Sequence, residues 1–339
     1  MAQQNGAEVG FPVPTGLQAF ADRARGYADQ SRAANTRRAY ASDVRAFATW
    51  CEERGEPAMP ASPAAVLAYL IDHATTLKVA TLQRRLAAIR EQHAAAGIAL
   101  DTSSAAFRDT WRGIKRAHGQ PADKKRPLMT VDLRRAVAVL PDSLTGLRDR
   151  ALILVGFAAA LRRSELASLE VARREDAAWI EERPDGLVIH LGRSKTDQQA
   201  EGVEIGVPYG SNMETCPVRS YRAWIKAARL EEGPAFRPID RHGRIGADAV
   251  TDRAVARIVQ RSVEAAALAE GHPPEEARRL AAAYAGHSLR SGLATSAAAN
   301  DAPGHAIQRQ LRHKRFDTTS GYIRSGQLFR QNPAGMAGL

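Results

Sequence analysis

Large apolar residues recur at helical spacing through the first third of the chain. Between residues 36 and 54 they follow at i, i+4, i+7 and i+10, which places them on one face of a helix; they are Tyr40, Val44, Phe47 and Trp50. Ser62-Pro63 combines an N-cap residue with a proline in the first turn, and so predicts the start of a second helix. Apolar residues at similar spacing around Leu86 and Trp111 predict two more helices.

These helices predict a compact helical domain over residues 15–118, preceded by a flexible tail over residues 1–14. The segment GQPADKKRP, residues 119–127, combines Gly and Pro with three consecutive basic residues, and we interpret it as a basic linker between domains. A second domain is then expected over residues 128–324, and a C-terminal tail over residues 325–339.

The second domain has a different pattern. Helical periodicity over residues 131–140 and 147–170 gives way to three short apolar runs separated by turn residues, which predict a small antiparallel sheet: 179–182, 186–191 and 203–207. Helical patterns resume in five segments: 217–229, 249–270, 274–285, 288–299 and 303–311. The fold class predicted for the whole chain is therefore mainly α with a small antiparallel β-sheet.

The chain is basic, and the charge is shared between the two predicted domains. Its 339 residues carry 48 Lys and Arg against 37 Asp and Glu, a formal net charge of +11. Residues 1–125 hold 17 basic and 12 acidic side chains, and the remainder holds 31 and 25. A positive surface attracts phosphate backbones, but 41 of the basic residues are Arg, which a GC-rich genome also favours. The charge therefore suggests a nucleic-acid partner without establishing one.

Other classes of protein fit the sequence poorly. The chain's two cysteines, Cys51 and Cys216, lie far apart and in no metal-binding spacing, so we expect neither a disulfide framework nor a zinc site. No apolar run approaches the roughly 20 residues that span a bilayer. The first residues also lack the basic and apolar regions of a secretory signal, which makes a cytoplasmic location the expectation.

Residues able to act on a phosphodiester gather in the second domain. They occur in the segments ALRRSEL, GRSKT, GHSLR and LRHKRFDTTSGYIR, and they are Arg162, Lys195, His287, Arg290, His313 and Tyr322. Each has an ordinary structural interpretation when it is taken alone. Together they supply two forked guanidiniums to neutralise phosphate oxygens, a hydroxyl nucleophile with a neighbouring base, and an ammonium group to protonate a leaving oxygen.

The order of these segments resembles the tyrosine recombinases, or phage integrase family. The spacing of nine residues between His313 and Tyr322 is part of that resemblance, which covers nearly the whole chain. The stretches RAFATWC, IHLGRSKT and SGYIR are most similar to the Cre-like branch of the family. The resemblance implies an N-terminal helical core-binding domain, which binds DNA, and an α+β catalytic domain after it.

The resemblance also implies a role for each residue of the site. Arg162 corresponds to the first catalytic arginine, and Glu165 to the acidic residue that supports it. Two departures from the family pattern stand nearby. Arg163 doubles Arg162, although the frame of Leu161 and Ser164-Glu165-Leu166 favours Arg162. The family usually has Gly just before its second His, whereas this chain has Arg312.

The remaining catalytic roles follow in chain order. Lys195 corresponds to the hairpin lysine, the general acid for the 5′-oxygen. His287 and Arg290 correspond to the His-x-x-Arg pair, and His313 to a position that is His in most members. Tyr322 corresponds to the nucleophile, which would form a 3′-phosphotyrosyl link and release a 5′-hydroxyl.

Candidate DNA-reading residues also come from the resemblance. Two helices of the first domain are expected in the major groove, and their candidates are Arg37, Arg38, Gln83, Arg84 and Arg85. In the second domain, VTDRAVARIV resembles a helix that reads a guanine, which makes Arg253 a candidate for a bidentate base contact.

The function that the resemblance implies is site-specific recombination of double-stranded DNA, with neither a metal nor ATP as cofactor. The DNA would carry inverted-repeat half-sites, bound by a homotetramer on two sites, and the free protein would be a monomer or weak oligomer. The C-terminal tail would pack on a neighbouring protomer or be a frayed terminus. The protein would be bacterial or phage-encoded. A type IB topoisomerase or telomere resolvase would share these residues, and a catalytically silent DNA-binding protein is the alternative from another class.

Overall fold

The computed structural model of the 339-residue chain describes residues 34–121, 125–175, 177–192 and 202–326, together with the single positions Phe20, Arg23 and Tyr27. The chain divides into two compact units, Met1–Asp123 and Lys124–Leu339. The boundary falls inside the basic segment 119–127. The predicted N-terminal tail and most of the predicted C-terminal tail lie outside the described residues.

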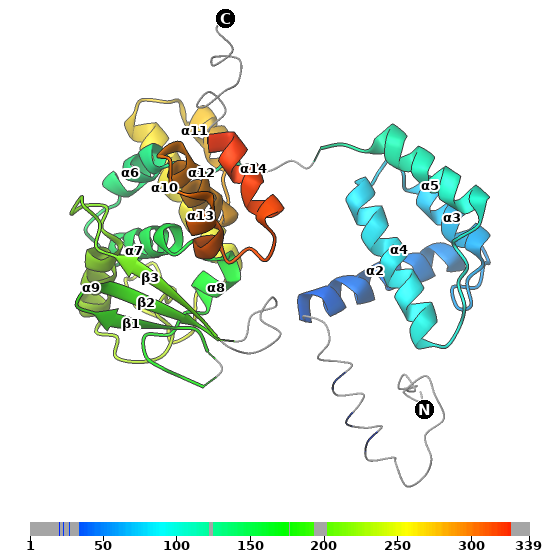
Figure 1. Ribbon diagram of the computed structural model, residues 1–339, viewed down its shortest axis with the longest axis horizontal. Helices are drawn as coiled ribbons and strands as arrows, with labels where there is room; N and C mark the ends of the chain where they lie inside the picture. The colour runs from blue at the N-terminus through cyan, green and yellow to red at the C-terminus, as the bar shows by residue number, and fades with distance from the viewer. Residues whose placement is uncertain are drawn as a thin grey trace, which may run out of the picture. The chain divides into compact units, whose positions relative to one another are not determined.

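The N-terminal unit is helical throughout its described part (Figure 1). Its helices are α2 (Ala34–Glu52), α3 (Pro63–Asp72), α4 (Val79–Ala95) and α5 (Ala105–His118). The second half of the stripe predicted on α2 is confirmed, because Phe47 and Trp50 are buried and pack edge-to-face against Tyr69 of α3. Ser62 caps α3 as predicted, accepting a hydrogen bond from the Ala65 backbone N–H at 3.0 Å.

A buried carboxylate ties two helices of this unit together. Asp43 of α2 is 3% exposed and accepts hydrogen bonds from Arg84 Nε and Nη2 of α4 at 2.7 and 3.0 Å. Arg85 lies beside the same carboxylate, with Nε 3.7 Å from Oδ1, and it also contacts the Tyr69 hydroxyl. Paired charges of this kind keep a buried carboxylate stable. The interaction therefore fixes how α2 packs on α4.

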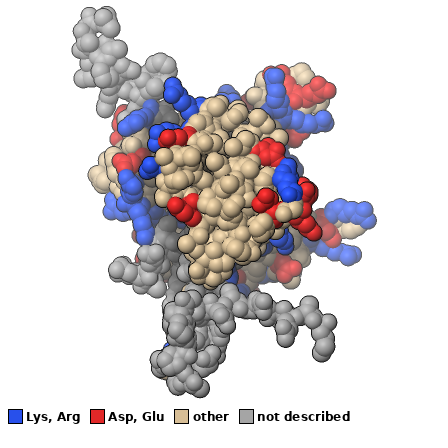
Figure 2. All heavy atoms as spheres, turned by 90° about the vertical axis from the view of Figure 1, so that its right-hand side faces the viewer, with Lys and Arg blue, Asp and Glu red and all other residues tan. Residues whose placement is uncertain are grey.

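One face of the N-terminal unit carries few charges. Figure 2 looks onto this unit and shows a broad uncharged area bordered by acidic and basic side chains. Helix α3 has the fewest charged residues of the unit, with Asp72 alone, and it leaves Ile71 51% exposed.

The C-terminal unit contains the predicted sheet. Strands β1 (Trp179–Arg183), β2 (Gly186–Leu191) and β3 (Val203–Pro208) pair antiparallel in the order β1-β2-β3, so the predicted sheet is confirmed. Alternate side chains of β2 face the core, as the period of a strand requires: Leu187, Ile189 and Leu191. Gly186 begins β2 where a Cβ atom would lie 2.2 Å from the Val207 carbonyl oxygen, and no larger residue fits there.

The described helices of the C-terminal unit pack against one another, and the sheet lies at one edge of them, beside α9 (Figure 1). They are α6 (Thr130–Ala138), α7 (Leu144–Ala158), α8 (Arg163–Ala167), α9 (Pro217–Ala228), α10 (Asp252–Ala269), α11 (Pro274–Ala282), α12 (His287–Ala299), α13 (Gly304–Leu311) and α14 (Phe316–Gly326). Helix α7 is the centre of the core, with Ala151, Leu152, Ile153 and Val155 fully buried. Chain segments on either side of it in the sequence pack against this one helix.

Residues just after the unit boundary lie against α12. The Leu128 N–H donates to the Ser288 carbonyl oxygen at 2.9 Å, and the Arg126 N–H donates to Ala283 O at 2.8 Å. Gly292 permits this close approach, because a Cβ there would lie 2.0 Å from the Leu128 carbonyl oxygen. The segment entering the unit is thus held next to the first turn of α12.

Two helix predictions for this unit were wrong or incomplete. The single helix predicted over residues 147–170 is two helices, α7 and α8, because Ala160 adopts a left-handed conformation with φ of 48° and ends α7. Helix α14 was not predicted, since its sequence FDTTSGYIRSG is rich in residues of low helix propensity. It forms by packing: Tyr322 and Ile323 lie against Ala294, Ile307 and Leu311 of α12 and α13.

No described helix is both long and apolar enough to cross a membrane.

The interaction of Asp43 with α4 predicts the effect of removing its carboxylate. Asp43→Ala leaves Arg84 and Arg85 without their shared partner, and we expect it to lower the free energy of unfolding of the N-terminal unit by about 1–3 kcal/mol. Urea denaturation of the full chain measures this change. Asp109→Ala is the matched control, because Asp109 and Arg112 form an exposed pair with side chains 68% and 74% accessible. Its expected change is below about 0.5 kcal/mol; equal effects of the two substitutions would contradict a structural role for Asp43.

Candidate active site

The turn that ends α7 places Arg162. The Ala160 N–H donates to Phe157 O and the Leu161 N–H to Gly156 O, a Schellman arrangement around the left-handed Ala160. Leu161 is buried, and Arg162 follows it as the N-cap of α8. The chain therefore turns at Ala160, and Arg162 follows at the start of α8 with its guanidinium partly exposed.

Glu165 holds Arg162 at two points. Glu165 Oε2 accepts from the Arg162 backbone N–H at 2.8 Å, and Oε1 accepts from the Arg162 guanidinium Nη1 at 2.5 Å. The Arg162 side chain is 35% exposed and that of Glu165 is 13% exposed. The neighbouring Arg163 instead pairs with Asp252 at the start of α10, at 2.7 Å. The two adjacent arginines thus have separate partners.

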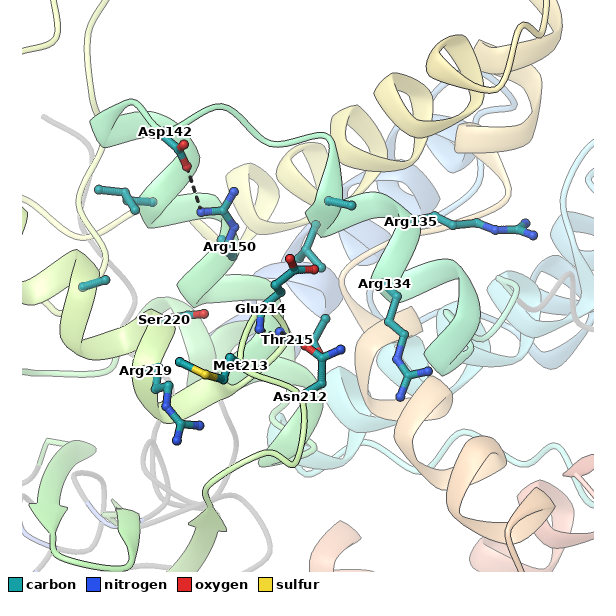
Figure 3. Close-up of a pocket in the computed structure, with 14 residues that line it drawn as sticks. Arg134, Arg135, Asp142, Arg150, Asn212, Met213, Glu214, Thr215, Arg219 and Ser220 are labelled. Carbon is teal, nitrogen blue, oxygen red and sulfur yellow. Dashed lines mark hydrogen bonds and ion pairs between the residues drawn. The ribbon is translucent and has the colours of Figure 1, made fainter.

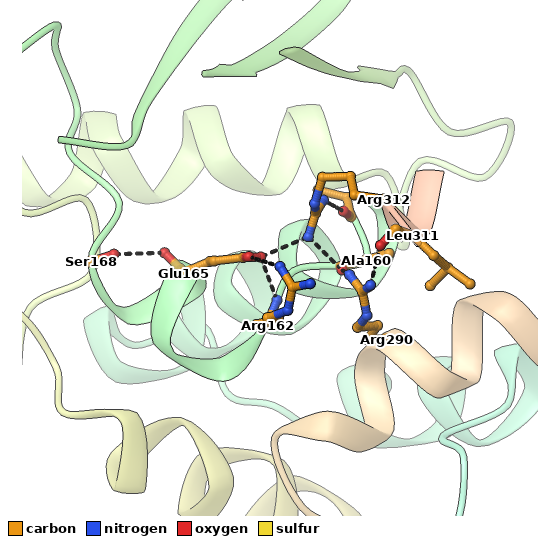
Figure 4. A network of polar contacts seen from close by, with 8 residues as sticks. Ala160, Arg162, Glu165, Ser168, Arg290, Leu311 and Arg312 are labelled. Atoms are coloured by element: carbon orange, nitrogen blue, oxygen red, sulfur yellow. Dashed lines mark hydrogen bonds and ion pairs between the residues drawn. The ribbon is translucent and has the colours of Figure 1, made fainter. Parts of the chain in front are cut away.

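Arg290 is brought to the same place by α12. It is 2% exposed and donates from Nη1 to the Ala160 carbonyl oxygen at 2.6 Å, and from Nη2 to the Leu311 carbonyl oxygen. Its backbone lies one turn along α12 from His287, as expected for residues three apart. Figure 4 shows Arg162 and Arg290 on either side of the end of α7, with Glu165 beside Arg162.

Tyr322 lies next to both histidines. Its hydroxyl oxygen is 3.3 Å from His287 Nε2, and its ring stacks on that of His313 with centroids 6.0 Å apart and planes at 20°. His313 Nδ1 is in turn hydrogen-bonded to the hydroxyl of Thr319, at 2.9 Å. Three segments far apart in the sequence therefore meet here: α12, the turn after α13, and α14.

Burial and positive charge lower the pKa values of the site. Burial, followed by the charges of Arg290 and Arg162, lowers the pKa of His287. Burial, and then Arg290, Arg162 and Arg312, lowers the pKa of His313 to about 4. Burial and the charge of Arg312 lower the pKa of Arg290 to about 10, which leaves it protonated at neutral pH. Both histidines are consequently neutral near pH 7, beside charged arginines.

The structure brings together five of the six predicted catalytic residues, with Glu165, in one place: Arg162, His287, Arg290, His313 and Tyr322. Lys195 lies outside the described residues, in the segment 193–201 between β2 and β3. Thr319 was not recognised from the sequence as part of the site, because a Thr in a polar run gives no signal before its hydrogen bond to His313 is seen.

The candidate DNA-reading residues differ in their surroundings. Arg84 and Arg85 both lie against Asp43, whereas Gln83 is exposed on α4. Arg38 contacts the Asn35 side chain in the first turn of α2, and Arg37 also has an interaction. Arg253 is exposed in the first turn of α10, which Thr251 caps. Their role in reading DNA stays a prediction.

A pocket of about 770 Å³ lies elsewhere in the C-terminal unit (Figure 3). It is bordered by Arg134 and Arg135 of α6, Arg150 of α7 and Arg219 of α9. It includes none of the site residues, so it is not the candidate active site. Among the described residues, no group of three or more His, Cys, Asp and Glu side chains is arranged to hold a metal ion.

Comparison with known proteins identifies the family. Residues 128–327 match the phage integrase family, and residues 27–97 match the phage integrase N-terminal SAM-like domain. An integrase/recombinase described as a XerD homolog, from Selenomonas ruminantium, is 37% identical over 308 residues, covering 90% of this chain and 85% of that protein. The chain belongs to the phage integrase family.

Two further comparisons agree with this membership. The recombinase Cre of Escherichia phage P1 is 25% identical to this chain over 265 residues, which cover 75% of this chain and 73% of Cre. The solved structure of the Tn1549 transposon integrase in complex with transposon right end DNA has a similar fold, with a TM-score of 0.56 and 14% identity over 95% of this chain and 98% of that chain. The resemblance to the tyrosine recombinases, Cre-like members included, is thereby confirmed. This protein is a tyrosine-type site-specific recombinase.

The lowered histidine pKa values predict how the stability of this protein depends on pH. In the unfolded chain His287 and His313 take up protons near their ordinary value of 6.5, whereas the folded chain takes them up at lower pH, about 4 for His313. The unfolded state therefore binds more protons between these values, so stability should fall as the pH is lowered from about 6.5 to about 4.

Thermal melting of the full chain at stepped pH measures this decrease. His313→Gln cannot take up a proton, and its melting temperature should fall less over the same range. The control is His305→Gln on the exposed surface of α13, which should retain the decrease of the unaltered protein. An equally steep decrease in His313→Gln would show that His313 does not contribute.

Proposed function

We propose that this protein cleaves and rejoins DNA strands through a covalent link between Tyr322 and a 3′-phosphate. The observation that carries the proposal is the contact between the Tyr322 hydroxyl and His287 Nε2, at 3.3 Å, beside two charged arginines. A phenol attacks phosphorus only as its proton leaves. A neutral imidazole at this distance is suited to accept that proton.

The proposed reaction is a transfer between two oxygens. The Tyr322 oxygen forms a bond to phosphorus, the bond from phosphorus to the 5′-oxygen breaks, and the Tyr322 proton passes to His287. The departing 5′-oxygen takes a proton from Lys195, a role that rests on the family resemblance alone. In the reverse step a 5′-hydroxyl attacks the phosphotyrosine and restores the phosphodiester. Because the bond energy is kept in the link, the proposed reaction needs neither ATP nor a metal.

Arg162 and Arg290 have the proposed role of binding the two non-bridging oxygens of the phosphate. Their guanidiniums are held in place before any substrate arrives, by Glu165 and by the carbonyl oxygens of Ala160 and Leu311. Donors fixed in advance stabilise developing charge without a cost of reorganisation during the reaction. His313, which stacks on Tyr322, would keep the phenol ring in its orientation and donate to the same phosphate.

The proposed partner is double-stranded DNA with inverted half-sites, bound by four protomers on two sites. Sequence identity to Cre and to the XerD homolog supports recombination between specific sites rather than relaxation at any sequence. The N-terminal unit, which matches the SAM-like domain, would supply contacts to DNA together with α10 of the C-terminal unit. Relaxation of a supercoiled plasmid that contains no such site would instead indicate a topoisomerase.

The nucleophile is tested with a DNA duplex containing the half-sites and a nick that traps the cleaved state. The full chain should form an adduct that survives denaturation and migrates slowly in a gel. Tyr322→Phe removes the attacking oxygen and should abolish the adduct while DNA binding, measured by fluorescence anisotropy, persists. Tyr209→Phe is the matched control, since Tyr209 contacts Arg222 rather than the site, and it should form the adduct normally. Adduct formation by Tyr322→Phe would remove Tyr322 as the nucleophile.

The two adjacent arginines give a second test of the site. Arg162→Ala removes a guanidinium held beside Glu165, and we expect the rate of adduct formation to fall by about 10²–10³-fold. Arg163→Ala removes one that pairs with Asp252, and it should cleave within a few-fold of the unaltered protein. Single-turnover adduct formation measures both rates. The opposite ranking would assign the catalytic role to Arg163.

A further inference from the structure

Arg312 stands where the backbone is least suited to it. It ends α13 in the left-handed conformation, with φ of 54°. The Arg312 N–H donates to Arg309 O and the His313 N–H donates to Gln308 O, so the residue is the left-handed member of a Schellman turn. Glycine takes this position with no steric penalty, whereas an arginine there carries strain. Contacts of the Arg312 side chain must therefore offset the strain in its backbone.

The side chain of Arg312 is buried and fully directed toward the end of α7. It is 8% exposed, and Nη2 donates to Glu165 Oε2 at 2.7 Å. The same guanidinium donates to the Ala159 and Ala160 carbonyl oxygens, each at 3.3 Å. Its Nε is buried without a partner. All of these contacts are to Glu165 and to the end of α7.

Arg312 shares its partners with both arginines of the proposed active site. Glu165 accepts from Arg162 through Oε1 and from Arg312 through Oε2. The Ala160 carbonyl oxygen accepts from Arg290 and from Arg312. Figure 4 shows Arg312 above this carbonyl, between Glu165 and Arg290. A continuous chain of polar contacts therefore runs from Arg162 to Arg290 through Arg312.

We propose that Arg312 is a positioning residue that fixes Arg162 and Arg290 relative to each other by holding Glu165 and the end of α7 together. The proposal rests on the proposed function of the two arginines. With Arg312 in place, Glu165 cannot turn away from Arg162, and the carbonyl that anchors Arg290 cannot move independently of Glu165. Small displacements of groups that bind a transition state reduce the rate steeply.

The test substitutes Arg312 by glycine, which relieves the left-handed strain and removes the contacts. Arg312→Gly should fold and bind DNA as the unaltered protein does, and its single-turnover adduct formation at saturating DNA should fall by about 10- to 100-fold. Arg312→Gln, which keeps amide donors but cannot pair with Glu165 as an ion, should also be slowed. Arg312→Lys, which restores the positive charge, should recover part of the rate.

Arg229→Gly is a matched control within the same chain. Arg229 ends α9 in the same left-handed Schellman turn, with φ of 52°, and none of its contacts reaches the site. The same substitution there relieves the same kind of strain and should leave cleavage unchanged.

The outcomes separate this inference from the proposed function. If the unaltered protein forms no Tyr322 adduct, the proposed function fails. If it does, and either Arg312→Gly or Arg312→Gln cleaves at the unaltered rate, the positioning role is overturned. It is also overturned if both variants lose melting temperature or DNA affinity in step with cleavage, since Arg312 would then serve the fold alone.

Discussion

The carbonyl oxygens at the end of α7 are the anchor on which the C-terminal unit's site depends. A helix leaves its last carbonyls without partners inside the helix, and their partial negative charge attracts cations. Here the Ala158 carbonyl oxygen accepts from Gln310, that of Ala159 from Arg312, and that of Ala160 from Arg290. Segments more than a hundred residues further along the chain are thereby held against one helix end. Ala160, whose left-handed conformation ends α7, carries the carbonyl oxygen that Arg290 and Arg312 share.

This anchor explains how several positive charges are kept close together. Arg162, Arg290 and Arg312 gather around one carboxylate, Glu165, and burial together with the charges of Arg312 and Arg162 lowers the pKa of Arg290. Carbonyl oxygens offset part of the repulsion between these charges without neutralising it. Under the proposed function, the phosphate of a DNA strand beside Tyr322 would supply the missing negative charge. Burial, and then the same positive charges, lowers the pKa values of His287 and His313.

The helix that carries Tyr322 owes its conformation to its neighbours. Residues such as Thr318, Thr319 and Gly321 favour other conformations in isolation, so α14 is stable only while Ile323 packs on α12 and α13. The position of the Tyr322 hydroxyl is therefore set by the packing of three helices. Gly326 lets α14 approach α12, because a Cβ there would lie 2.6 Å from the Thr295 carbonyl oxygen.

The sequence by itself determined the fold class, the helices of the N-terminal unit, the three strands and the candidate catalytic residues. These follow from local periodicity and from motif order, which the sequence displays directly. The break between α7 and α8, the helix α14 and the shared partners of Arg312 were decided by tertiary structure. Each depends on contacts between residues distant in sequence, such as Arg312 with Glu165, and local conformational propensity does not predict such contacts. The sequence could show that Arg312 replaces a glycine; only the fold shows what its side chain holds.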